Sequence, residues 1–352
     1  MDRIFDTINV DAVVVSDPYN MRHMSGFAGG EGYVYFSTKT KAIITDSRYT
    51  EAASKEAYDG FYVIEATVAK SHLEVIKDLA AADGAKSIGF EDLYISYSGY
   101  MNLKEKCGFG NLVPVGDYLN NLRSIKEPWE IDRMRIAESI GDKAFSHVLN
   151  IIRPGMTELE VAAELEYAMK KNGASSLSFD TIAASGPNTS LPHAVPGKRV
   201  IKEGDFVTMD FGCIYEGYCS DMTRTIVVGH ADDRQIEIYN TVYKAQTESL
   251  KAIHAGVIGC DIHKVAADII AEAGYGQYFG HGLGHSVGLY IHESPNFSPR
   301  EKNAIMANTV ITVEPGIYVP DFGGVRIEDM IVVTENGYEN LAHSKKELIE
   351  II

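Results

Sequence analysis

The feature that most constrains this chain is an internal repeat in its second half. Three pairs of segments match at a spacing of about 100 residues: 152–174 with 253–276, 206–212 with 310–316, and 220–228 with 327–333. Each copy has the pattern of a helix, a second helix and a β-hairpin region. We therefore expect two similar halves that pack about a pseudo-two-fold axis.

The repeat superimposes acidic residues. Asp210 in MDFG aligns with Glu314 in VEPG, and Asp221 aligns with Glu328. The first pair lies inside apolar strand-like runs, where an unpaired charge is very costly. An isolated acid at a hairpin rim is usually solvated, but matched acids in both copies are what a pair of metal ions on the axis requires.

Turn geometry in the first copy supports this interpretation. A two-residue turn at Glu216-Gly217 sets Gly212 opposite Asp221. Asp210 lies two residues from Gly212 and so shares its face. Asp210 and Asp221 are then diagonal cross-strand neighbours, roughly 7–8 Å apart at the backbone.

In the second copy the turn falls near residues 320–323, and an odd-length loop sets Glu314 opposite Glu328. Thr223 lies two residues after Asp221 and shares its face. We therefore expect its hydroxyl to hydrogen-bond to a ligand of the metal site.

Four histidines stand beside these hairpins: His193, His281, His285 and His292. Glycines at 280, 282, 284 and 288 make a helix there unfavourable, and no HExxH motif occurs, so extended backbone is predicted. A lone histidine is more often structural than a ligand. A set of four carboxylates and one histidine is rich in oxygen, which favours manganese or cobalt over a cysteine-bound zinc.

The first 120 residues alternate between short strands and helices, which predicts an α/β domain. Strands are expected at 10–16, 32–38, 41–47, 61–66 and 87–92, and a helix at 71–84 that ends at Gly84. A further helix is expected to begin at Pro128. We place the domains at 1–122 and 123–352.

Composition excludes several classes of function. The chain has 32 Lys and Arg against 49 Asp and Glu, a net charge of −17, which disfavours nucleic-acid and membrane partners. Its four cysteines form no CxxC pair, and no apolar run is long enough to span a bilayer. Neither GxSxG nor a phosphate-binding GxxxxGK[ST] loop is present. A cytoplasmic protein is expected.

The motifs MDFG, SDMTRT, HGLGHSVG, TVEPG and VRIED resemble the metal-binding motifs of the pita-bread metallopeptidases, in the Xaa-Pro branch of aminopeptidase P and prolidase. MRHMSGFAGGEGYV and ITDSRYTEAA resemble the creatinase-type N-terminal domain of that branch. The resemblance implies an α/β (α+β) fold in which this smaller domain precedes a pita-bread catalytic domain. It implies a homodimer and five metal ligands: Asp210, Asp221, His285, Glu314 and Glu328.

The resemblance also implies a mechanism for peptides with proline at position 2. Two divalent ions, bridged by Asp221 and Glu328, are expected to hold an attacking hydroxide. We expect Mn²⁺, with Co²⁺ or Zn²⁺ as alternatives. Glu314 moves the proton to the leaving nitrogen. The resemblance further implies His193 and His292 as catalytic histidines and Arg326 behind the ligands. His281, which stands beside the same hairpins, is a further candidate at the substrate or behind the ligands.

Several alternatives stay open. Within the Xaa-Pro branch, a dipeptidase differs from aminopeptidase P in capturing the carboxylate of the proline. Arg300 is a candidate anchor for that carboxylate, and a solvated loop arginine is the alternative. A methionine-aminopeptidase-like hydrolase and a non-catalytic binding protein that reuses the fold are the other candidates.

Overall fold

The computed structural model describes residues 3–352, and the chain forms two compact units, one ending at Arg123 and the other beginning at Ser124. Among the residues described, no helix is long and apolar enough to cross a membrane. Each unit has its own hydrophobic core. The units are therefore described separately.

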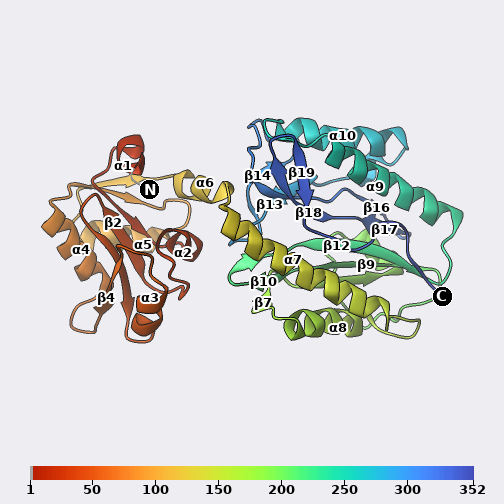
Figure 1. Ribbon diagram of the computed structural model, residues 1–352, viewed down its shortest axis with the longest axis horizontal. Helices are drawn as coiled ribbons and strands as arrows, with labels where there is room; N and C mark the ends of the chain where they lie inside the picture. The colour runs from red at the N-terminus through yellow and green to blue at the C-terminus, as the bar shows by residue number, and fades with distance from the viewer. Residues whose placement is uncertain (1–2) are drawn as a thin grey trace. The chain divides into compact units, whose positions relative to one another are not determined.

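The first unit is built on a six-stranded mixed sheet in the order β4-β3-β2-β1-β5-β6 (Figure 1). Its strands are β1 (Ala12–Val15), β2 (Tyr33–Ser37), β3 (Lys41–Asp46), β4 (Tyr62–Ala66), β5 (Ser87–Phe90) and β6 (Asn111–Pro114). The five predicted strands are confirmed. The sequence analysis missed β6 because it is short and contains a proline, which is tolerated there because the strand lies at the sheet edge.

Helices flank this sheet. They are α1 (Arg3–Ile8), α2 (Pro18–Ser25), α3 (Thr50–Glu56), α4 (His72–Asp83), α5 (Tyr97–Lys106) and α6 (Tyr118–Ser124). The predicted helix is α4, which begins with a capping box between Ser71 and Glu74. It ends at Gly84, whose φ of 72° is in the left-handed region that glycine adopts easily.

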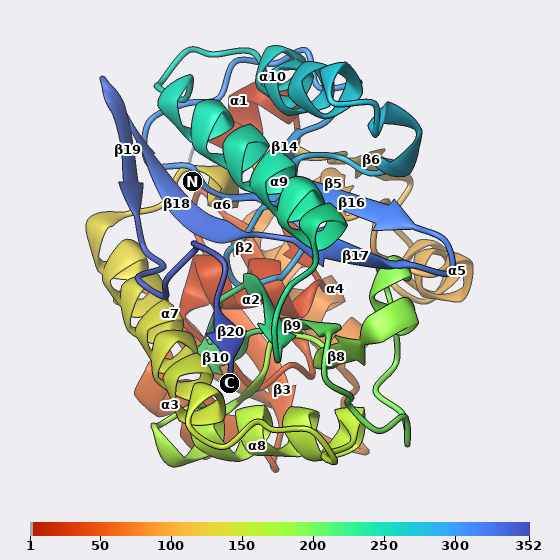
Figure 2. The same cartoon turned by 90° about the vertical axis from the view of Figure 1, so that its right-hand side faces the viewer.

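The second unit contains the predicted repeat as two helix pairs. The pairs are α7 (Pro128–Leu149) with α8 (Glu158–Lys171), and α9 (Asp233–Lys251) with α10 (Gly259–Glu272). Pro128 is the first residue of α7, as predicted. Figures 1 and 2 show the two pairs on opposite sides of the unit, with strands between them.

The strands between the helix pairs form two main sheets, in the orders β20-β12-β9-β8 and β14-β13-β15-β18-β19. The first contains β8 (Ile182–Ser185), β9 (Asp205–Phe211), β12 (Met222–Val228) and β20 (Glu350–Ile351). The second contains β13 (Gly284–Ser286), β14 (Glu293–Phe297), β15 (Val310–Val313), β18 (Asp329–Thr334) and β19 (Gly337–Asn340).

Smaller ribbons extend these sheets, and two 3₁₀ helices connect them. They are β7 (Ser176–Leu177), β10 (Cys213–Tyr215), β11 (Tyr218–Cys219), β16 (Gly316–Val319), β17 (Gly323–Arg326), η1 (Gly186–Ser190) and η2 (Gly276–Tyr278). The hairpin β9–β12 of the first copy corresponds to β15–β18 of the second.

The register of the first hairpin agrees with the sequence prediction. Tyr215 pairs with Tyr218, which leaves the two-residue turn Glu216-Gly217. The same register continues into β9 and β12, where Asp210 pairs with Thr223. Asp221, two residues before Thr223, is therefore the diagonal neighbour of Asp210.

The second hairpin also has the expected register. Val319 pairs with Gly323, which leaves a loop of three residues. Val313 pairs with Asp329 in the same register. Continuing it by one residue places Glu314 opposite Glu328.

The backbone of Gly284 packs so closely against β15 that a side chain there tests the packing of this sheet. A Cβ at this position of β13 would lie 1.9 Å from the Thr312 carbonyl oxygen on β15. We expect Gly284→Ala to lower the melting temperature by about 2–12 °C, because relieving a backbone clash in a packed site costs roughly 1–3 kcal/mol. A Cβ added at exposed Gly280 would meet no atom within 4 Å, so Gly280→Ala is the control and should melt like the wild type. Equal melting temperatures of the two variants would contradict this packing.

Candidate metal centre

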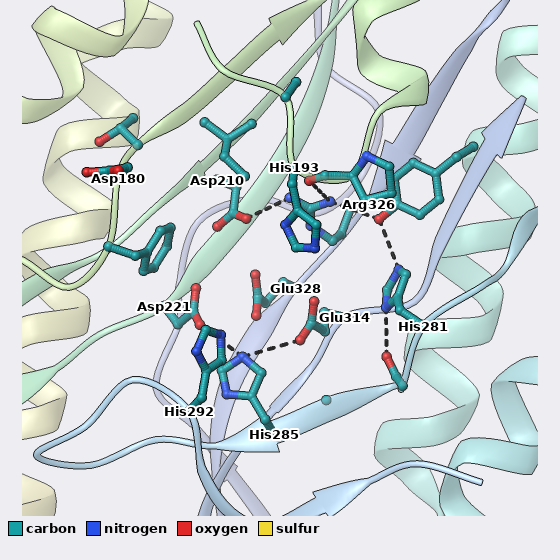
Figure 3. Close-up of a pocket in the computed structure, with 18 of the residues that line it drawn as sticks. Asp180, His193, Asp210, Asp221, His281, His285, His292, Glu314, Arg326 and Glu328 are labelled. Carbon is teal, nitrogen blue, oxygen red and sulfur yellow. Dashed lines mark hydrogen bonds and ion pairs between the residues drawn. The ribbon is translucent and has the colours of Figure 1, made fainter. Parts of the chain in front are cut away.

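The five predicted ligands converge between the two hairpins (Figure 3). Asp210 lies in β9, Asp221 precedes β12, and His285 lies in β13. Glu314 follows β15, and Glu328 precedes β18. One ligand atom from each of Asp221, His285 and Glu328 lies within 4.8 Å of the other two, close enough to hold one ion together.

Burial makes this arrangement electrostatically unfavourable without cations. Asp221 is 5% exposed and Glu328 is 2% exposed. Burial, together with the neighbouring carboxylates, raises the pKa of both groups well above the usual value. Burial raises the pKa of Glu314 to about 8, with Asp210 contributing further. Carboxylates that disfavour ionisation this strongly are suited to share positive ions.

His285 is oriented for metal binding. Its Nδ1–H donates to the Ser286 carbonyl oxygen at 3.2 Å, which leaves Nε2 as the unprotonated nitrogen. That Nε2 lies 3.5 Å from Asp221 Oδ2 and 3.5 Å from Glu314 Oε1. Thr312 links two ligands, since it accepts from the His285 backbone N–H and donates to Glu314 Oε1.

Thr223 and Arg326 support the carboxylates from behind. The Thr223 hydroxyl donates to Glu328 Oε2 at 2.6 Å, as expected for a residue that holds a ligand. Arg326 Nε donates to Thr223 Oγ1, and its Nη2 donates to Asp210 Oδ2 at 2.6 Å. Arg326 thus contacts Asp210 directly and reaches Glu328 through Thr223.

The hydrogen bonding of Asp210 indicates that the five predicted ligands suit bound cations. Its Oδ2 accepts from Arg326, whereas its buried Oδ1 has no hydrogen-bond partner within residues 3–352. A buried acceptor of this kind is costly unless a ligand satisfies it. Four carboxylates and one imidazole form a donor set that suits two divalent ions.

The sequence analysis missed Glu138 on α7. Its side chain is completely buried, and Oε2 accepts from the Asp221 backbone N–H at 3.3 Å. Burial raises its pKa well above the usual value, and repulsion from Asp142 adds to this. The available signal was an acidic residue beside Ala137 and Gly141 on the apolar face of a helix.

A cavity of about 670 Å³ opens over the ligands. His193, His281 and His292 line it together with His285, so all four predicted histidines meet there. The rings of His285 and His292 stand edge to face with centroids 4.6 Å apart. Burial lowers the pKa of His292, which favours a neutral ring at pH 7.

His281 belongs to a hydrogen-bonded chain at one wall of the cavity. Arg326 Nη1 donates to the Tyr318 oxygen, and the Tyr318 hydroxyl donates to His281 Nε2 at 3.0 Å. His281 Nδ1–H then donates to the Gly282 carbonyl oxygen. Burial lowers the pKa of His281 to about 4, consistent with this neutral tautomer. The role of Tyr318 was not anticipated from the sequence.

Arg300 does not line the cavity and, unlike Thr223, contacts none of the predicted ligands among the interactions described. It follows β14, its side chain is exposed, and its backbone N–H donates to Ser298 Oγ. Ser298 itself lines the cavity, so the chain turns away from the site within two residues. Asn296 lines the cavity in this segment instead, a position that no sequence motif indicated.

Comparison with known proteins agrees with this geometry. The metallopeptidase family M24 model matches residues 132–335, and the creatinase/prolidase N-terminal domain model matches residues 2–125. The chain is a member of metallopeptidase family M24. It therefore has a creatinase-type N-terminal domain and a pita-bread catalytic domain, as the sequence indicated. Membership implies divalent metal ions and a hydrolase activity on peptides.

Three similar proteins cover the chain almost completely. The Bacillus subtilis protein named uncharacterized peptidase YqhT is 43% identical over 346 residues, which are 98% of this chain and 97% of the relative. The structure of an Xaa-Pro dipeptidase from Bacillus anthracis has a TM-score of 0.95, 43% identity, and coverage of 98% and 96%. An X-Pro aminopeptidase from Thermotoga maritima has a TM-score of 0.93, 37% identity, and coverage of 99% and 100%.

The raised carboxyl pKa values predict how the metal-free protein responds to pH. Folded Glu314 keeps its proton up to about pH 8, whereas in the unfolded chain it loses the proton near pH 4.5. The folded state therefore binds more protons across this window, and its stability falls as the pH rises. We expect the melting temperature in chelator to decrease from pH 5.5 to 8, and Mn²⁺ to raise it more at pH 8 than at pH 5.5.

The variant Glu314→Gln separates the contribution of this carboxyl group to the pH dependence of the melting temperature. Glu314→Gln carries no titrating group at this position, so its melting temperature in chelator should vary less with pH. A metal-free wild type whose melting temperature rises from pH 6 to 8 would contradict the account.

Proposed function

We propose that the protein is a metal-dependent exopeptidase that hydrolyses the bond between an N-terminal residue and proline. The observation that carries the proposal is the convergence of four carboxylates and His285 beneath a cavity lined by three more histidines. The oxygen-rich donors favour Mn²⁺. The relatives named Xaa-Pro dipeptidase and X-Pro aminopeptidase support the choice of substrate.

When bound, a pair of divalent ions supplies a water of lowered pKa and polarises the carbonyl under attack. Asp210, Asp221, His285, Glu314 and Glu328 would hold these ions between them. Thr223 and Arg326 keep Glu328 and Asp210 in place through their hydrogen bonds.

Glu314 is proposed to move the proton. The nitrogen of an Xaa-Pro bond carries no hydrogen, so it must gain a proton before it can leave. Glu314 lines the cavity beside the other carboxylates, so its side chain is within reach of a peptide bond held over them. Thr312 donates to its Oε1 and fixes its orientation.

His292 and His193 are proposed to stabilise the carbonyl oxygen and position the substrate. Both line the cavity opposite one another, on either side of the carboxylates in Figure 3. A neutral His292 ring has an N–H to donate to the developing oxyanion. The net charge of −17 on the chain mildly favours a peptide whose free N-terminus is cationic.

The proposal is tested with full-length protein loaded with Mn²⁺. The substrates are Ala-Pro-Ala, Ala-Ala-Ala and N-acetyl-Ala-Pro-Ala, with release of N-terminal alanine as the measurement. We expect cleavage of the first and little or no cleavage of the others, with loss of activity in chelator. Equal cleavage of Ala-Ala-Ala would overturn the proline requirement, and cleavage of the acetylated peptide would overturn the exopeptidase assignment.

His292→Ala tests the assignment of that residue to the transition state. We expect kcat to fall by about 10²–10³, the usual effect of removing one oxyanion donor, with bound metal unchanged. Metal content is measured on the same preparation by mass spectrometry. A loss of metal in step with the loss of activity would make His292 a ligand instead.

A further inference from the structure

The walls of the cavity are strongly acidic. The carboxylates that line it are Asp180, Asp210, Asp221, Glu314 and Glu328. Among the described residues that line the cavity, Arg326 is the single lysine or arginine. Two divalent ions balance the four ligand carboxylates, and Asp180 balances Arg326, so no net positive charge remains for an anionic substrate group.

Arg326 is also unavailable as a partner for a substrate. It is 4% exposed, and its guanidinium group donates four hydrogen bonds, to Thr223 Oγ1, the Tyr318 oxygen, the Pro192 carbonyl oxygen and Asp210 Oδ2. Turning it toward a ligand would leave the buried Asp210 carboxylate without its cation, which is costly.

Asn296 offers a neutral group in the same cavity. It pairs with His285 across β13 and β14, so the two side chains project from the same face of the sheet. Its Oδ1 is buried and accepts no hydrogen bond from any part of the chain that the structure describes. An unpaired buried amide oxygen is unfavourable, and a rotation of the terminal side-chain bond can present it to a ligand.

The length of the peptide determines which chemical group of the substrate follows the proline and lies near the Asn296 side-chain amide. In an Xaa-Pro dipeptide the proline ends in a carboxylate, which needs a cation or several strong donors when it leaves water. In a longer peptide the proline is followed by a neutral amide. A side-chain amide both donates and accepts hydrogen bonds, so it can pair with the C=O or with the N–H of a peptide group.

We propose that this site acts on peptides of three or more residues rather than on dipeptides, and that Asn296 hydrogen-bonds the peptide group that follows the proline. This inference rests on the proposed function. A cavity of about 670 Å³ is in the range that encloses drug-sized ligands, so it has room for residues beyond the proline. Asn296 is thereby a specificity-determining residue for the length of the substrate.

The experiment compares Ala-Pro, Ala-Pro-amide and Ala-Pro-Ala on the Mn²⁺-loaded full-length protein. Ala-Pro-amide differs from Ala-Pro in charge at the group under test and hardly in size. We expect kcat/KM for the amide and for the tripeptide to exceed that for Ala-Pro by at least about tenfold. Tenfold corresponds to 1.4 kcal/mol, less than the usual cost of leaving a buried charged group unpaired.

Two variants test whether Asn296 is responsible for this difference in kcat/KM. Asn296→Ala should lower kcat/KM for the amide and the tripeptide by about 2- to 10-fold, the loss expected for one neutral hydrogen bond, and leave Ala-Pro unchanged. Arg300→Ala is the matched control from the same segment, exposed and outside the cavity, and should leave all three values unchanged.

The outcomes separate the inference from the proposed function. Cleavage of none of the three substrates overturns the proposed function and the inference with it. Cleavage of Ala-Pro as fast as its amide retains the Xaa-Pro activity and overturns the preference for length. Equal losses on all three substrates in Asn296→Ala overturn the role of Asn296. A selective loss on Ala-Pro in Arg300→Ala overturns the inference, because it would identify Arg300 as a carboxylate anchor.

Discussion

Repulsion between buried carboxylates is the constraint on which the catalytic unit depends. Asp221 and Glu328 are almost inaccessible to water, and their pKa values are raised well above normal by burial and by the charges of neighbouring carboxylates. A fold gains nothing from such a cluster unless cations or protons neutralise it. The surrounding hairpins position these carboxylates, the cavity opens over them, and Arg326 donates a hydrogen bond to Asp210.

The repeated hairpin explains how the cluster is assembled. Each copy has two carboxylates near the junction of two paired strands, and the turn lengths set the registers that bring them together. Residues outside the repeat then refine the site. Thr223 fixes Glu328, Arg326 fixes Asp210, and Glu138 on α7 accepts from the backbone of Asp221.

The sequence was most informative where periodicity and turn chemistry decide the structure. The repeat predicted the four converging carboxylates and both hairpin registers, and helical spacing with a terminal glycine predicted α4. It was least informative about contacts made across elements. The direct link between Arg326 and Asp210 depends on side-chain direction between two sheets, and the place of Arg300 outside the cavity depends on one turn after β14. Asn296 gave no signal because a neutral amide in a short strand has no characteristic pattern.

Equilibrium metal content measures whether the buried carboxylates hold two ions. Full-length protein is dialysed against Mn²⁺ at pH 8, free metal is removed, and bound metal is measured against protein concentration. We expect two Mn²⁺ per chain, and at most one in Glu328→Gln, which lacks one of the proposed ligand carboxylates. A wild type that holds no stoichiometric metal, or a Glu328→Gln variant that still holds two ions, would contradict this expectation.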